Sequence, residues 1–444
     1  MKRKALFTFI FLLLPPAMIF AQGQKASLNL SLKQAQEYAV ANNKVVKSAK
    51  LDVIASRAAL WETISAALPS VEGSGSFTDN LKLMTTLLPG EFFGQPGTKI
   101  PVTFGSKYNT GVSVQASMLL FNAPLYIGIE TTKLANKLSE QNLERTELDT
   151  KESVSTVYFL ILVAEESLRI LDSNIVNLNE TLRSVKSMYQ VGMAESTDVD
   201  QMMSNVTMAE NSRSSLLRNI ELDYNLLRFQ LGVPGNTEIS LTETLENLID
   251  QINVDAILSQ NFDINNNVDY KLITMQEEIS KLTVMSQKAS VLPTLAGFYT
   301  YGTNGMGDKV SDQRWFPNSM VGLQLSIPVF ASGQRYTKIK KAQLDLSKAR
   351  NNKALVTDQL LMQEKQLRYD LVNANLQYLS QKDNVEVSKR VYTSMENKYR
   401  QGMASSLELT QANSQYLQAE NNYITSLMSL LQTKVALDKL MNNM

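Results

Sequence analysis

The residue types that could do chemistry in this chain are limited, because its 444 residues include no Cys and no His. Disulfides, Cys nucleophiles, His general bases and zinc sites built on either residue are therefore excluded. No nucleophile–base pair and no phosphate-binding glycine loop stands out, and no group of carboxylates is dense enough to indicate a metal site. The 43 Lys and Arg residues are balanced by 43 Asp and Glu residues, so the chain has no excess positive charge for binding a nucleic acid. We expect no enzyme activity, no catalytic residue, no metal, no cofactor and no nucleic-acid partner.

Two acidic residues, Asp198 and Glu408, are candidate functional residues because each lies just past a copy of the same motif. The motif reads Tyr-Gln-Val-Gly-Met-Ala at 189–194 and Tyr-Arg-Gln-Gly-Met-Ala at 399–404. A carboxylate in the first turn of a helix is stabilised by the helix dipole and needs no further role. Several carboxylates around one narrow opening would instead attract cations and raise one another's pKa, which would make the opening sensitive to pH. Both interpretations stay open for Asp198 and Glu408.

A very long predicted helix precedes each copy of the motif. The first helix is predicted from about residue 128 to residue 190, and from Val154 to Tyr189 its apolar residues recur at alternating steps of three and four. This seven-residue repeat predicts a left-handed coiled coil, and the rise per residue makes the helix roughly 95 Å long. Residues 334–401 repeat the register with a more polar seam. Such helices are several times longer than the hydrocarbon core of a membrane is thick.

A tight turn and a returning helix follow each long helix. Gly192 and Gly402 are expected to end the long helices in the left-handed conformation that glycine tolerates best. Ser196 in the first half, and Ser405 or Ser406 in the second, are expected to cap the helices that return. These returning helices are predicted over 197–231 and 406–442.

Period-two alternation of apolar and polar residues predicts two pairs of strands, one in each half. The strands are expected at about 71–78, 112–120, 295–301 and 321–329, with a loop at 79–108 inside the first pair. The same alternation fits either a soluble sheet packed on helices or a membrane barrel. Aromatic residues near the loops favour the barrel as interface anchors. They are Phe92, Phe93, Phe104, Tyr108, Trp315 and Phe316.

The N-terminus also favours a membrane location. A basic start, an apolar run and a small residue at Ala21 predict a secretory signal peptide that is cleaved after Ala21. No other apolar run is long enough to span a bilayer as a helix, so strands must carry the chain through a membrane. Four strands cannot close a barrel, and an open sheet edge is not tolerated in lipid, so strands from identical chains must join. A trimer is the smallest symmetric assembly that gives a plausible hollow barrel, with twelve strands.

We therefore predict a mostly α-helical, internally duplicated fold. A trimeric twelve-stranded membrane β-barrel, with four strands per chain, would continue into a long α-helical coiled-coil barrel in the periplasm. Ser31 is expected to cap a continuous helix that runs to Leu68. The predicted segments are a signal peptide at 1–21, an N-terminal periplasmic helix at 22–68, a first β-hairpin of the barrel at 69–121, a first long helical hairpin at 122–234, an equatorial subdomain at 235–265, a periplasmic helix at 266–292, a second β-hairpin at 293–330, and a second long helical hairpin with the C-terminus at 331–444.

The chain resembles the TolC family of outer-membrane efflux proteins over essentially its whole mature length. The resemblance is carried by Leu-Pro motifs at 68–69 and 292–293, by the segment 328–335 between strand and helix, and by the paired Tyr-x-x-Gly motifs. It implies a homotrimeric channel in the outer membrane. The channel would passively conduct substrates from an inner-membrane pump or secretion transporter, through a periplasmic adaptor protein, to the exterior. From the residues alone, the alternative is a secreted coiled-coil structural or adhesive protein without a pore.

The resemblance also assigns roles at the tips of the helical hairpins. Thr197 and Asp198 match the acidic position after the first tip, Glu408 matches the first acid after the second, and Tyr399 matches a tyrosine that latches the entrance. Gln411 and Ala404 depart from the family's pattern, where a second acid and a latch arginine stand. The adaptor is expected to dock at Gly192, Met193, Ala194, Gly402, Met403 and Ala404.

Because the second half has the more polar seam, we expect residues 364–442 to form the pair of helices that moves.

Overall fold

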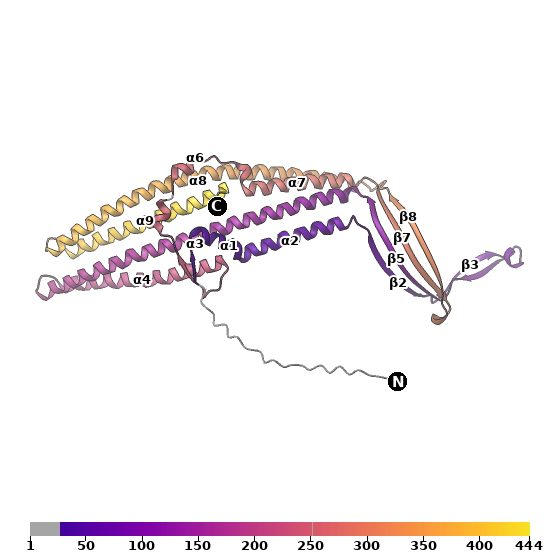
Figure 1. Cartoon of the computed structure of the whole chain (residues 1–444), viewed down its shortest axis with the longest axis horizontal. Helices are drawn as coiled ribbons and strands as arrows, with labels where there is room; N and C mark the ends of the chain where they lie inside the picture. Colours follow the sequence, from indigo (N-terminus) through magenta and orange to yellow (C-terminus); the bar gives the residue numbers. More distant parts are fainter. Residues whose placement is uncertain (1–26, 251) are drawn as a thin grey trace, which may run out of the picture.

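The computed structural model describes residues 27–250 and 252–444, so the predicted signal peptide lies outside the described residues. The molecule is long and narrow, with a curved β-sheet at one end, helices along its length and two helical hairpins at the other end (Figure 1). Within residues 27–250 and 252–444, no helix is both long and apolar enough to cross a membrane.

Four antiparallel strands form the sheet. In spatial order they are β2 (Ser70–Asp79), β5 (Tyr108–Phe121), β7 (Thr294–Gly307) and β8 (Arg314–Ser326), with the short helix η3 (Val310–Asp312) between the last two. Each half of the chain supplies one predicted pair, and β5 joins β7 in the middle. Val71, Ala116, Tyr299 and Val321 are register partners in one row across the sheet, so the strands of both halves place their apolar residues on the same face. Val71 and Val321 are 69% and 80% exposed, so this apolar row is largely uncovered within the chain.

The expectation of a plain loop at 79–108 is wrong, because this segment contains a second, separate sheet. There β3 (Met84–Pro89) pairs with β4 (Lys99–Phe104) across the short helix η1 (Gly90–Phe93). Pro89 ends β3 and Pro101 lies inside β4, and these prolines argued against strands in the sequence. A two-stranded sheet tolerates them because each of its strands is an edge strand. The last strand of the main sheet also ends at Ser326, short of the predicted residue 329. Pro328 follows closely and has no N–H to extend the ladder.

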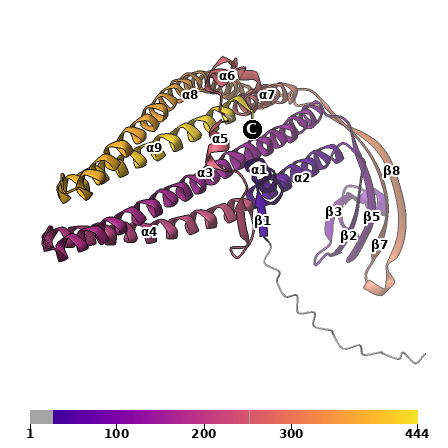
Figure 2. The same cartoon turned by 60° about the vertical axis from the view of Figure 1, so that its left-hand side comes forward.

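Two long helices run away from the sheet, α3 (Ala123–Gln190) with 68 residues and α8 (Gln334–Arg400) with 67. The first begins after Asn122, whose side chain accepts a hydrogen bond from the backbone N–H of Leu125. The helices α4 (Ser196–Leu231) and α9 (Ser406–Met441) return along them, and Figure 2 shows the two resulting hairpins side by side. The four predicted helices are confirmed, with ends within a few residues of the expected positions.

The expectation of one continuous helix from Ser31 to Leu68 is wrong. Ser31 does cap a helix through a capping box, but α1 (Leu32–Asn42) ends after three turns and α2 (Lys44–Ser65) begins at once. Asn43 makes the break, since its side chain accepts from the N–H of Val45 and donates to the carbonyl of Gln230 at 2.7 Å. An Asn that caps a new helix competes with the backbone of the old one.

The middle of the molecule is held by short elements around the core. They are β1 (Ser27–Leu30), which pairs in parallel with β6 (Glu238–Leu241), and α5 (Leu245–Asp250), α6 (Val254–Ser259), η2 (Ile264–Asn266) and α7 (Val268–Ala289). Tyr158 of α3 is fully buried there, and its hydroxyl donates to the carbonyl of Leu30 at 3.1 Å. Burial raises the pKa of Tyr158 to about 12, so this hydroxyl keeps its proton.

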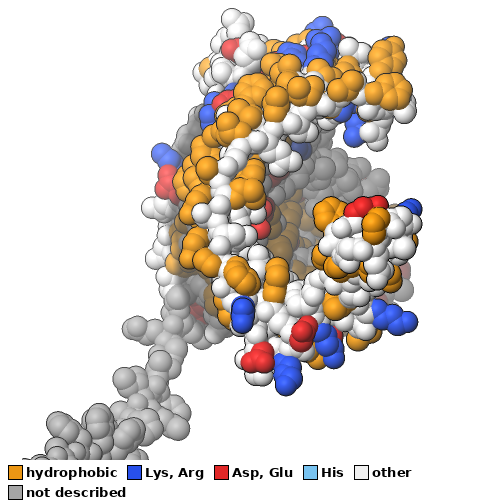
Figure 3. Space-filling view, turned by 90° about the vertical axis from the view of Figure 1, so that its right-hand side faces the viewer, with side chains coloured by type: hydrophobic (Ala, Val, Ile, Leu, Met, Phe, Trp, Pro, Cys, Tyr) orange, Lys and Arg blue, Asp and Glu red, His pale blue; other side chains and the backbone are white. Residues whose placement is uncertain are grey.

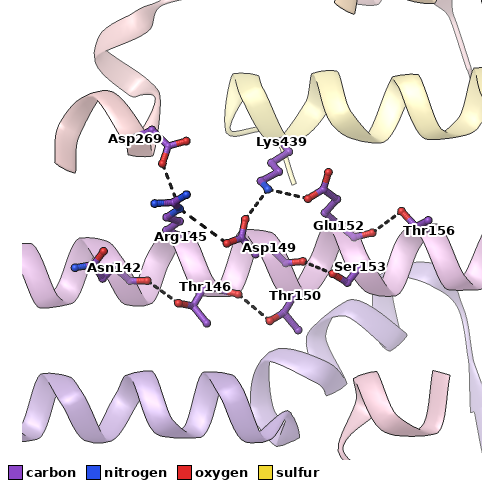
Figure 4. A network of polar contacts seen from close by, with 10 residues as sticks. All are labelled: Asn142, Arg145, Thr146, Asp149, Thr150, Glu152, Ser153, Thr156, Asp269 and Lys439. Atoms are coloured by element: carbon purple, nitrogen blue, oxygen red, sulfur yellow. Dashed lines mark hydrogen bonds and ion pairs between the residues drawn. The ribbon is translucent and has the colours of Figure 1, made fainter. Parts of the chain in front are cut away.

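A charged network ties α3 to α7 and α9 at the same height (Figure 4). Lys439 lies 2.5 Å from Asp149 and 2.7 Å from Glu152, while Arg145 lies 3.2 Å from Asp269. All of these side chains are partly exposed, so each pair adds little stability by itself. These ion pairs instead orient the helices, because they connect α3 of the first half with α7 and α9 of the second.

Candidate functional site at the helical tips

The turns at the tips have the glycine geometry that the sequence predicts. Gly192 and Gly402 have φ angles of +80° and +72°, in the left-handed region. The N–H of Met193 returns to the carbonyl of Met188, and the N–H of Met403 to that of Lys398, each at 2.8 Å. This is the hydrogen-bond pattern that closes a helix after a left-handed glycine. The turns leave Met193 and Met403 at the surface, 79% and 65% exposed.

Capping boxes start both returning helices, but one cap differs from the prediction. Ser405 caps α9 as expected: its hydroxyl accepts from the N–H of Glu408, while its own N–H donates to the Glu408 carboxylate at 2.8 Å. In the first half, Glu195 is the cap and Ser196 is the first helical residue, so the predicted Ser196 cap is wrong. The N–H of Glu195 donates to Asp198 at 3.1 Å. The N–H of Asp198 in turn donates to the backbone carbonyl of Glu195 at 3.2 Å.

These caps set the electrostatics of Glu408 within one chain. Its carboxylate accepts from both the backbone N–H and the hydroxyl of Ser405, and these bonds hold the pKa of Glu408 below its usual value. Lys398 adds a smaller effect in the same direction. Glu408 is therefore charged at neutral pH in the isolated chain. A ring of such groups would have to raise the pKa of Glu408 against this local stabilisation.

Asp198 and Tyr399, predicted separately from the two halves, lie together. The hydroxyl of Ser406 donates to the Asp198 carboxylate, which links the first turn of α9 to the first turn of α4. Tyr399 is 6% exposed in the same region, and burial, with a smaller contribution from Asp198, raises the pKa of its hydroxyl. Glu408 instead faces its own cap, and Thr197 donates to Glu195 at 3.2 Å. From the sequence, Ser406 was expected only as a possible cap, and its hydrogen bond to Asp198 was not predicted.

Two further polar contacts continue up the boundary between the hairpins. Asn205 of α4 donates to Thr410 of α9 at 3.3 Å, and the buried Asn174 of α3 donates to Asn413 of α9 at 2.7 Å. We call the three contacts Asp198–Ser406, Asn205–Thr410 and Asn174–Asn413 the inter-hairpin ladder. In the sequence, polar residues interrupt the apolar seams of these helices. That pattern indicated polar contacts but not which residues pair with one another.

An apolar cluster packs beside the ladder. It contains residues of all four tip helices, namely Leu178, Leu182, Val185, Met202, Val206, Ala209, Tyr392, Tyr399, Leu409 and Ala412. The rings of Tyr392 and Tyr416 stack with their centres 5.9 Å apart. The hairpins are thus joined by a mixed surface, apolar in the middle and polar along the ladder.

The sheet at the opposite end has one apolar and one polar face. Tyr301, Leu323 and Leu325 are exposed on the apolar side, and Figure 3 shows hydrophobic side chains gathered along the curved sheet seen from that end. On the other face, Ser74 and Ser113 form a hydrogen-bonded pair across β2 and β5 at 2.8 Å. A wall between lipid and water needs one face of each kind.

Comparison with known proteins gives consistent matches along most of the chain. The model of the outer membrane efflux protein family matches residues 36–233 and 274–443. The outer membrane protein TolC of Vibrio cholerae is 20% identical over 244 residues, which is 52% of this chain and 53% of that protein. The chain thus spans about half the length of this curated relative.

Solved structures show the same fold. The outer membrane protein VceC from Vibrio cholerae is 13% identical with a TM-score of 0.75, and the match covers 92% of this chain and 95% of that one. CusC is 16% identical with a TM-score of 0.75, covering 93% and 92% of the two chains. The outer membrane channel CmeC from Campylobacter jejuni is 18% identical with a TM-score of 0.71, covering 93% and 85%.

Proposed function

Because the chain belongs to the outer membrane efflux protein family, we propose that it is the outer-membrane channel of a tripartite efflux or secretion system. The protein lies in the outer membrane with its helices in the periplasm, and the predicted helical, internally duplicated fold is confirmed. The observation that carries the proposal is that one chain contains both a two-faced β-sheet and very long helices continuous with it. A sheet with one apolar and one polar face leads directly into helices of 68 and 67 residues, about 100 Å long.

We propose that the working channel is a homotrimer. The sheet ends in two strands with a free edge within the described chain, β2 and β8. The helices above the sheet also follow the order α2, α3, α7, α8, so α2 and α8 lie at opposite edges. Each presents a row of apolar residues, most of them seven positions apart, that stay more than half exposed within the described part of the chain. These seams are Leu51, Ile54 and Trp61 on α2, and Leu344, Leu355, Met362, Tyr369 and Leu376 on α8.

A heterologous contact joins these edges if β2 and α2 of one copy meet β8 and α8 of the next. Such an interface closes into a ring when the rotation per copy matches the number of copies. Three copies supply twelve strands, which leaves a water-filled interior lined by the polar face of the sheet.

We propose that the entrance is gated by separation of the two helical hairpins. Asp198, Thr197, Tyr399 and Glu408 remain the candidate gate residues, and Ser406 joins them. The inter-hairpin ladder supports this, because a polar contact exchanges protein partners for water at a net cost of only about 1 kcal/mol each. Residues 364–442 are the proposed moving pair. The exposed Met193 and Met403, with Ala194 and Ala404, are the proposed docking points for a periplasmic adaptor.

The channel is tested by reconstitution. The mature protein is extracted with detergent, its mass is measured, and it is inserted in a planar lipid bilayer. We expect a trimer that gives discrete conductance steps. A protein that stays soluble as a monomer without detergent and gives no conductance would overturn the proposal.

A further inference from the structure

A cavity of about 510 Å³ lies between α3, α4 and α9, on the sheet side of the tips. Its walls are partly apolar, through Ile170, Leu171, Leu178, Leu216 and Leu417, and partly polar. This volume falls within the range of about 300–1,000 Å³ that is usual for small-molecule sites. The cavity is built by both hairpins, because α3 and α4 belong to the first and α9 to the second.

Two acceptor groups of this cavity, the amide oxygen of Asn174 and the carboxylate of Glu420, bear on what it can bind. Asn174 is 2% exposed; its amide nitrogen donates to Asn413, but its oxygen Oδ1 has no partner within the described chain. Glu420, also buried, adds a carboxylate to the lining. Arg169, whose charge reaches Glu420, is held 2.5 Å from Glu166. A buried acceptor without a donor costs free energy, so the cavity favours an occupant that brings N–H groups.

We propose that this cavity binds a small amphipathic amine. Its apolar body packs against the leucine and isoleucine walls, and its ammonium group donates to Asn174 Oδ1 and to the Glu420 carboxylate. A ligand with a positive charge suits the site better than a neutral one, because Glu166 and Glu420 together carry two negative charges against the single positive charge of Arg169.

The position of the site predicts an effect on the gate, and this part rests on the proposed function. A ligand that contacts α3, α4 and α9 together binds only while the hairpins are joined. Binding to one arrangement shifts the population toward it. Occupancy therefore stabilises the closed entrance and lowers the open probability of the channel.

The binding step is tested on the full trimer in lipid nanodiscs by fluorine NMR. The probe is 2-[4-(trifluoromethyl)phenyl]ethylamine, and the matched neutral probe is the corresponding alcohol. Three variants address the site: Glu420→Gln removes the charge, Asn174→Leu removes the free acceptor, and Ser212→Trp obstructs the cavity from an exposed position on α4. Ser187→Trp, exposed on α3 and outside the lining, is the matched control.

We expect the amine to bind about tenfold more tightly than the alcohol, and Glu420→Gln to remove that difference. Ser212→Trp should abolish binding of both probes, while Ser187→Trp leaves it unchanged. Equal affinity for amine and alcohol, or undiminished binding in Ser212→Trp, would overturn the site; these two readouts stand even if Asn174→Leu fails to fold. The probe should also lower the open probability in bilayers. Binding without that effect would overturn the link to the gate, whereas a protein that never conducts would overturn the proposed function instead.

Discussion

The Ser406 hydroxyl donates a hydrogen bond to the Asp198 carboxylate, across 208 positions of sequence. The contact joins the first turns of α4 and α9, which are the two helices that return from the tips. It is the part of the inter-hairpin ladder nearest the entrance, and it connects the half of the chain proposed to stay fixed with the half proposed to move.

Replacing Ser406 with Ala should loosen the entrance. The variant removes a hydrogen bond to a charged group, worth about 1.4 kcal/mol, so we expect the open probability in planar bilayers to rise roughly tenfold. Ser187→Ala is the control, because in the described part of the chain that hydroxyl donates to the carbonyl of Arg183 in its own helix. Equal conductance in the two variants would show that the contact does not hold the entrance closed.

Joining the two hairpins covalently should keep the entrance shut. The chain has no Cys, so the double variant Asp198→Cys, Ser406→Cys can be bridged cleanly by a short thiol-reactive cross-linker. We expect conductance to fall to background after bridging if the hairpins must separate. Each single-Cys variant, treated in the same way, should keep its conductance. Full conductance in the bridged protein would argue against separation of these helices.

Acid should loosen the second tip through Glu408. The folded pKa of this carboxyl is lowered by the Ser405 cap, so its contribution is present above the usual value of 4.5 and is lost as the pH falls through the lower folded pKa. A spin label at Met403→Cys should become more mobile in that acidic range. In Glu408→Gln the neutral amide can still accept the hydrogen bond of the capping box but does not titrate. The mobility of the spin label should then not change with pH. The same pH response in both proteins would assign the effect to another group.

Substituting Gly232 should destabilise the joint between α4 and α1. Gly232 has a φ of +71°, and a Cβ there would lie 2.6 Å from the carbonyl oxygen of Asn42. Gly232→Ala should lower the free energy of unfolding by about 1–3 kcal/mol, seen as a lower midpoint of thermal unfolding. Gly235→Ala, where a Cβ meets nothing within 4 Å, should be neutral or slightly stabilising. Equal midpoints for the two variants would contradict the close approach.

A charge on the α2 seam should weaken the proposed trimer. Trp61→Glu places a carboxylate where an apolar surface is proposed to be buried against the next copy, so we expect dissociation to smaller species in detergent, measured by native mass spectrometry. Ala59→Glu adds the same charge to an exposed position of α2 away from the seam and should leave the trimer intact. Loss of the trimer in both, or in neither, would mean that this seam is not the interface.

The sequence predicted the long helices well because a seven-residue repeat over many turns leaves little choice of structure. The four main strands were also predictable, since an alternation of period two determines which face of the sheet each residue joins. The break at Asn43 and the Glu195 cap were missed because single side chains decide them. The β3–β4 hairpin was hidden by its prolines. The Asp198–Ser406 contact lies outside any local pattern, because it depends on how two separate hairpins pack.

The interleaving of the two halves in one sheet, with β5 beside β7, has a consequence for biogenesis. In a solitary chain the main sheet has two open edges, β2 and β8, and the helices α2 and α8 carry exposed apolar seams. Such surfaces favour association with any similar segment nearby. The single subunit is therefore a hazardous intermediate that must be short-lived. Insertion and association have to proceed together, so the rate at which copies find one another, rather than the stability of one copy, should limit the yield of this protein in a cell.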